Sequence, residues 1–232
     1  MTAAKPTTAP LSWLLLLLSV TTGMVDAISV LGLGKVFTAN MTGNIVFLGF
    51  AAAGTPGFRA PLYILAIAAF LFGALVAGRV GKGYAGLPLR RWLLSAAVVE
   101  TGLLWIAAIF AIGLDIASQS PAHGVYAVIA LTGLAMGFRN ATIRQLKVPD
   151  LTTTVLTLTL TGIAADSSLA GGGNPNWAKR LGAVAAIFVG AAFGAVLVAR
   201  VGLAPPLLIA GLLVLLGTIA CALHPASAAP TA

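Results

Sequence analysis

Charged side chains are scarce in this sequence, since only 8% of its 232 residues are Asp, Glu, Lys or Arg. A soluble globular domain carries about 25% charged residues, which cover the surface that faces water. Hydrophobic residues make up 59% of the chain, and its mean hydropathy is +1.05. The polar residues are gathered in short stretches between long apolar ones, as expected where lipid is the solvent. The composition therefore excludes a soluble domain and predicts an integral membrane protein.

Cysteine, histidine and catalytic motifs are also scarce. Cys221 is the single cysteine, so neither an intrachain disulfide nor a cysteine metal cluster can form. His123 and His224 are the two histidines, and no phosphate-binding Gly-rich loop, zinc-protease helix motif or serine-hydrolase elbow occurs. We therefore expect no metal, no cofactor and no enzymatic activity, and a membrane-embedded enzyme is the least favoured reading.

The net charge of +8, from 13 basic and 5 acidic residues, would suggest nucleic-acid binding in a soluble protein. Here the basic residues lie between the apolar segments, where the excess of Lys and Arg in cytoplasmic loops accounts for them. Such loops also attract anionic lipid headgroups, by about 1 kcal/mol per basic residue. The charge thus indicates a lipid bilayer as partner and argues against nucleic acid.

Proline residues precede most apolar stretches and divide the chain into eight hydrophobic segments. Six have the roughly 20 residues that a bilayer crossing requires, and we expect the first to be retained as a helix and not cleaved as a signal peptide. Two are short or polar and rich in threonine. The sequence predicts an all-α polytopic membrane protein with segments at about 11–31, 36–54, 61–80, 92–113, 124–143, 150–165, 180–201 and 206–223.

The two halves of the chain resemble each other. Residues 71–81 and 192–202 are identical at six of eleven positions. A second set of matches falls at one constant offset, pairing Gly23, Asp26, Ala27 and Thr38 with Gly137, Asn140, Ala141 and Thr152. We interpret the chain, residues 1–232, as a single membrane domain with two repeats of four segments, at about 11–113 and 124–223.

The number of crossings remains open between six and eight. If the threonine-rich segments are re-entrant, each half crosses three times and the repeats are inverted, as in many secondary transporters. If they cross fully, the repeats are parallel. Six crossings place 10 basic residues on the cytoplasmic side and 3 outside, whereas eight crossings divide them 9 to 4. The positive-inside rule therefore narrowly favours six crossings, with a cytoplasmic N-terminus.

Ionisable residues inside the apolar segments are the first candidates for function. A charge at bilayer depth costs several kcal/mol, so it normally faces a cavity or a partner. The candidates are Asp26 in the first segment, Glu100 in the fourth, and Arg139 and Asn140 in the fifth. They indicate a solute, ion or proton site, and the alternative is a structural ion pair such as Asp26 with Arg139.

The second candidate set lies in the threonine-rich segments. Glycines make the segment around residues 32–43 a poor continuous helix, so we expect an unwound stretch followed by a helix that starts near Thr42. Interrupted helices at matching places in two repeats are typical of transporter binding sites. Alternatively, these side chains bond to their own helix or cement helix contacts. The candidates are Asn40, Thr42, Asn44, Thr152, Thr153 and Thr154.

These stretches carry a family resemblance. Residues 23–27 (GMVDA), 37–44 (FTANMTGN), 137–141 (GFRNA) and 149–154 (PDLTTT) resemble the YoaK-like family of bacterial multi-pass membrane proteins of unknown function, over about residues 11–223. The resemblance implies a bacterial inner-membrane protein with about six spans and no established substrate. Arg139 departs from the family pattern, where a more neutral polar residue is expected.

Secondary transport of a small solute, with proton coupling through Asp26 or Glu100, is the function that these features favour. The runner-up is a non-transporting membrane scaffold or partner subunit. Small residues spaced by four suit close helix packing in the core or at a homodimer seam, and they are Ala69, Gly73, Ala77, Gly190 and Gly194.

Overall fold

The structure is a computed structural model in which residues 9–146 and 156–228 are described. These residues are helical apart from their loops and an isolated bridge between Asp115 and Ser120, which confirms the all-α prediction. The α-helices in this part of the chain are α1 (Ala9–Gly32), α2 (Met41–Ala52), α3 (Ala60–Lys82), α4 (Leu89–Ala111), α5 (Ala122–Leu146), α6 (Leu156–Ala165), α7 (Trp177–Val201) and α8 (Ala204–Leu223). Two short 3-10 helices, Ser168–Ala170 and Pro225–Ala228, complete the secondary structure.

Five of these helices, α1, α3, α4, α7 and α8, are long and apolar enough to cross a bilayer. Helix α5 is 25 residues long, but Arg139, Arg144 and other polar residues in its second half make it less apolar, and it is not among the five. Helices α2 and α6, with 12 and 10 described residues, are shorter apolar helices below the length of a crossing. The chain is a multi-pass membrane protein.

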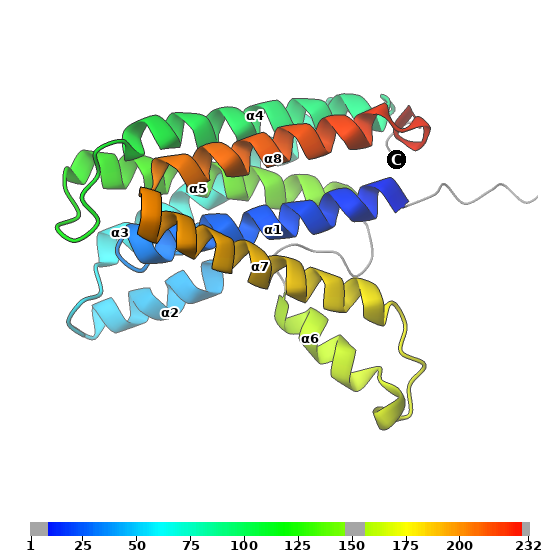
Figure 1. Ribbon diagram of the computed structural model, residues 1–232, viewed down its shortest axis with the longest axis horizontal. Coiled ribbons are helices and arrows are strands. Elements are labelled where there is room, and N and C mark those ends of the chain that lie inside the picture. The colour runs from blue at the N-terminus through cyan, green and yellow to red at the C-terminus, as the bar shows by residue number, and fades with distance from the viewer. Residues whose placement is uncertain (1–8, 147–155, 229–232) are drawn as a thin grey trace, which may run out of the picture.

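The long helices form an elongated bundle (Figure 1). In that view α1 runs from right to left and α3 returns, while α5 runs from left to right and α7 returns. Helices α2 and α6 each start nearer the middle of the bundle and end near the side at which the next long helix begins. The C-terminal end of α8 lies at the same end of the bundle as the start of α1.

Glycines allow two pairs of long helices to approach closely. Helix α1 packs on α7, and α3 packs on α5. A Cβ atom at Gly190 of α7 would collide with the carbonyl oxygen of Val20, and one at Gly73 of α3 would collide with that of Leu134. Helix α4 packs against α8 and α5, and α8 also packs against α1. The predicted role of the small residues in close helix packing is thus confirmed for Gly73 and Gly190.

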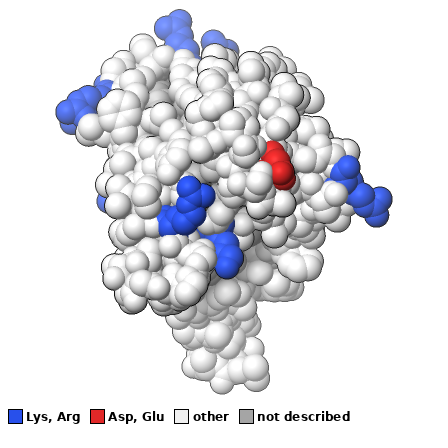
Figure 2. Space-filling model, turned by 90° about the vertical axis from the view of Figure 1, so that its left-hand side faces the viewer, with Lys and Arg blue, Asp and Glu red and all other residues white. Residues whose placement is uncertain are grey.

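The two ends of the bundle differ in charge. In the order of the chain, the loops at the left end of Figure 1 carry Lys35, Arg59 and Asp115, with Arg200 at the end of α7. Figure 2 shows this end as a mainly uncharged surface with isolated basic side chains. The opposite end is richer in basic residues, with Arg79, Lys82, Arg90, Arg91, Arg144, Lys179 and Arg180 in the described residues.

Candidate functional site

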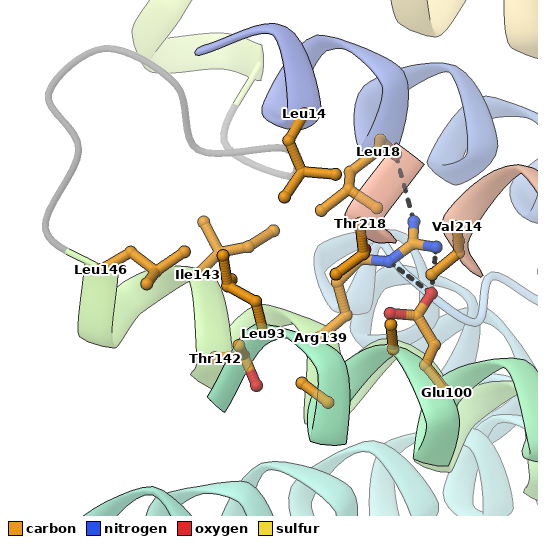
Figure 3. A pocket seen from close by; sticks show the side chains of 12 residues that line it. Leu14, Leu18, Leu93, Glu100, Arg139, Thr142, Ile143, Leu146, Val214 and Thr218 are labelled. Carbon is orange, nitrogen blue, oxygen red and sulfur yellow. Dashed lines mark hydrogen bonds and ion pairs between the residues drawn. The ribbon is translucent and has the colours of Figure 1, made fainter. Parts of the chain in front are cut away.

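A buried ion pair joins α4 to α5 in the interior. The Nε atom of Arg139 donates to Oε1 of Glu100 at 2.8 Å, and the NH2 group of the guanidinium contacts the same oxygen (Figure 3). The two residues are 1% and 4% exposed. The NH1 group donates to the carbonyl oxygen of Leu18 at 3.1 Å and to Oγ1 of Thr22 at 2.9 Å. Arg139 therefore ties α4, α5 and α1 together.

A cavity of about 30 Å³ lies beside this ion pair (Figure 3). Glu100, Arg139, Thr142 and Thr218 are its polar lining residues, and the remainder are Leu14, Leu18, Leu93, Ala96, Ala97, Ile143, Leu146 and Val214. Such a volume holds about one or two water molecules. The cavity therefore has room for water beside the ion pair but is too small for an organic solute.

Asp26 lies in the last two turns of α1 and has a different environment. Its Oδ1 atom accepts a hydrogen bond from the backbone N–H of Ala39 at 3.1 Å, and the backbone N–H of the neighbouring Thr38 also stabilises the carboxylate. The residue is partly exposed. Among residues 9–146 and 156–228, no basic side chain forms an ion pair with Asp26. The alternative that pairs Asp26 with Arg139 is therefore wrong, because Arg139 forms its ion pair with Glu100 on the neighbouring helix.

The segment between α1 and α2 is non-helical, and α2 begins at Met41, which confirms the predicted interruption. Gly34 and Lys35 both have positive φ angles, of 80° and 63°, where the chain reverses after α1. The left-handed conformation suits glycine because it has no Cβ atom. The reversal brings Thr38 and Ala39 back against α1, beside Asp26.

Asn44 holds this non-helical segment to α2. Its Nδ2 atom donates to the carbonyl oxygen of Phe37 at 2.6 Å, and its Oδ1 accepts from the N–H of Phe37 at 2.9 Å. Asn44 is fully buried. Both ends of its amide are therefore engaged with one residue, and Asn44 positions the segment instead of offering a free ligand.

The other predicted residues lie at the surface, bond to their own helix, or fall outside the described part of the chain. Asn40 and Thr42, at the start of α2, are exposed. Asn140 is half-buried, and its Nδ2 atom donates to the carbonyl of Met136 one turn earlier at 2.8 Å. Thr152, Thr153 and Thr154 lie outside the described residues.

Successive turns of α1 connect these features. Leu14 and Leu18 line the cavity, Thr22 contacts Arg139, and Asp26 follows one turn later. Thr22 and Thr38 were not among the predicted site residues. The sequence signal for Thr22 is its spacing of four residues from Asp26, because residues i and i+4 share a helix face. Thr38 also had a sequence signal, because it lies in the motif 37–44 and pairs with the candidate Thr152 of the second half.

Comparisons with known proteins agree on a family. The protein-family model described as a protein of unknown function (DUF1275) matches residues 14–220. The UPF0700 transmembrane protein YoaK of Bacillus subtilis (strain 168) is 35% identical over 159 residues, which cover 67% of this chain and 66% of that protein. No solved structure matches the chain. This protein therefore belongs to the DUF1275 family of proteins of unknown function, and the resemblance to YoaK-like membrane proteins is confirmed.

Proposed function

We propose that this protein is a secondary transporter for a small solute, with its binding site at Asp26 and the interrupted segment before α2. The observation that carries the proposal is Asp26, a partly exposed acidic residue within a helix that enters the bilayer. Its carboxylate accepts a hydrogen bond from the backbone N–H of Ala39 and forms no ion pair among the described residues. Ionisable groups at such depth are costly and mark solute or ion pathways. Interrupted helices beside them are typical of transporter sites.

Two inverted repeats would give the site its two-sided access. Helices α1 and α5 begin the two halves and run in opposite directions (Figure 1). The contact of α1 with α7 has its counterpart in that of α5 with α3. These relations support repeats at about 11–113 and 124–223, each with three crossings and one short helix, in the inner membrane of a bacterium.

Asp26 suits proton or ion coupling better than Glu100. Glu100 accepts from both Nε and NH2 of Arg139 and is 4% exposed. Removing its charge would leave the guanidinium buried without a partner, which is strongly unfavourable. Asp26 is partly exposed and forms no ion pair in the described residues, and Arg139 acts on it only from a longer distance. A change in its charge therefore requires no ion pair to break.

The topology can be tested by cysteine labelling in a Cys221→Ala background. We expect Thr55→Cys to react with a membrane-impermeant thiol reagent from outside, because its loop lies at the end that is poor in basic residues. We expect Asn174→Cys to react from the cytoplasmic side. In this topology, each labelled loop lies on the same side of the membrane as the loop before its short helix. If each labelled loop instead lies on the opposite side from that preceding loop, the chain has eight crossings and parallel repeats.

Transport itself predicts that the start of α2 is reached from both sides. We expect Thr42→Cys, in the same Cys221→Ala background, to be modified from outside in intact cells and from the cytoplasmic side in inverted vesicles. Thr42 is exposed at the end of α2 that lies toward the middle of the bundle, so we expect the proposed path to pass it. Thr55→Cys is the matched control and should react from one side only. Reaction of Thr42→Cys from a single side would contradict transport.

A scaffold or homodimer subunit is the second candidate. The observations that favour it are the glycine contacts of α1 with α7 and of α3 with α5, and a cavity of only about 30 Å³ at the ion pair. A scaffold predicts that the labelling of Thr42→Cys is confined to one side and depends on the presence of a partner helix.

A further inference from the structure

We infer that the Asp26 site binds a monovalent cation, with the carboxylate of Asp26 and the hydroxyl of Thr38 as ligands. The inference takes the site of the proposed transporter and names the class of its ligand. It depends on the charges of the interior, on an unpaired hydroxyl beside the carboxylate, and on the non-helical backbone between α1 and α2.

When Asp26 is ionised, the described interior carries an excess negative charge. Its acidic and basic residues are Asp26, Glu100 and Arg139, and Glu100 cancels Arg139 through their ion pair. Asp26 is left without a basic partner among these residues. The N-terminus of α2, with roughly half a positive charge, and the more distant Arg139 offset only part of the charge of ionised Asp26. A charge in a low-dielectric interior requires a partner, which a bound cation would supply.

The hydroxyl of Thr38 is available as a second ligand. Thr38 is fully buried, and its Oγ1 atom has no hydrogen-bond partner within the described residues. Buried polar groups are nearly always paired, and an exception indicates a missing water molecule or ion. The backbone N–H of Ala39, the next residue, donates to Oδ1 of Asp26 at 3.1 Å, so Thr38 is one residue away from a direct contact with the carboxylate. Its unpaired hydroxyl is therefore the candidate second ligand.

The backbone supports cation binding at this position. The segment before α2 is not helical, so its carbonyl groups are not committed to helical hydrogen bonds, although that of Phe37 accepts from Asn44. In membrane transporters, unwound carbonyls beside interrupted helices coordinate sodium ions or protons. A carboxylate, a hydroxyl and carbonyl oxygens form a hard-oxygen set, which suits Na⁺ or NH₄⁺ better than a soft transition metal.

The inference predicts that a monovalent cation stabilises the full-length protein in detergent. The measurement replaces choline chloride by NaCl, KCl or NH₄Cl at constant pH and ionic strength. With at least one of these salts, Tm is expected to rise by about 5–10 °C when the cation concentration is about 100 times the Kd of the cation. The dependence on concentration should saturate. Asp26→Asn should abolish the shift, and Thr38→Val should weaken the apparent affinity at least about tenfold, as expected for loss of a buried polar ligand.

The controls separate binding from folding. Thr38→Ser keeps the hydroxyl and should keep the response. Thr132→Val removes a buried hydroxyl that already donates to the carbonyl of Val128, and it should leave the response unchanged. If Asp26→Asn does not fold, the contrast between Thr38→Val and Thr38→Ser still tests the site. Equal Tm in all four salts, or a Tm that depends on pH alone, overturns the inference. Cation stabilisation with Thr42→Cys labelled from one side only would support the cation site and contradict transport.

Discussion

Replacing Glu100 by leucine is expected to destabilise the protein by about 3–5 kcal/mol, the usual cost of removing one partner of a buried ion pair. Arg139 would remain 1% exposed, with its charge uncompensated between α4, α5 and α1. Leucine cannot accept the hydrogen bonds that Nε and NH2 now donate. Denaturant unfolding of the purified protein in detergent measures the loss.

The double variant Glu100→Leu with Arg139→Met is the matched control. It removes both charges and leaves apolar groups in their place, so it should be more stable than Glu100→Leu alone. Thr22 and Leu18 are not left unpaired, because Oγ1 of Thr22 already donates to the carbonyl of Leu18 at 2.8 Å. If the effects of the two single variants simply added, Glu100 and Arg139 would not act as a pair.

Replacing Gly73 by alanine is expected to cost about 1–3 kcal/mol or to prevent folding. An added methyl group would meet the backbone carbonyl of Leu134, which cannot move without separating α3 from α5. Overpacking of a closely packed interior typically costs this much. The variant can be compared with the wild type by thermal unfolding in detergent.

Gly78→Ala in the same helix is the control, because nothing lies within 4 Å of a Cβ atom at that position. Alanine is a better helix former than glycine, so this variant should be neutral or more stable by up to about 1 kcal/mol. Gly190→Ala in α7 should behave like Gly73→Ala, since its Cβ atom would meet the carbonyl of Val20. Equal stability of Gly73→Ala and Gly78→Ala would contradict the close approach of α3 and α5.

The helices were largely predictable from composition and proline positions. The expected segment 61–80 corresponds to α3, Ala60–Lys82, and 206–223 corresponds to α8, Ala204–Leu223, which has proline in its first turn. A run of about 20 apolar residues satisfies its own backbone only as a helix in lipid, so these boundaries depend on local sequence. The start of α2 at Met41 follows from the glycines before it.

The candidate site was predictable only as a set of residues. Asp26 and Asn44 were both expected as solute ligands, but Asn44 holds the two backbone groups of Phe37. Asn140 bonds to the helix turn before it. Whether an amide is free depends on which backbone groups come within hydrogen-bond distance, and that depends on how the chain reverses between α1 and α2.

The sequence by itself determined that this protein is a multi-pass helical membrane protein and which polar residues lie within its apolar segments. Both follow from the free energy of transferring side chains and backbone into lipid, which is a property of each segment alone. Only the tertiary structure decided that Arg139 pairs with Glu100 and that Asp26 is left to the N–H groups of residues 38 and 39. The physical reason is that the range of an ion pair or hydrogen bond is a few ångströms, whereas its partners come from helices far apart in the chain.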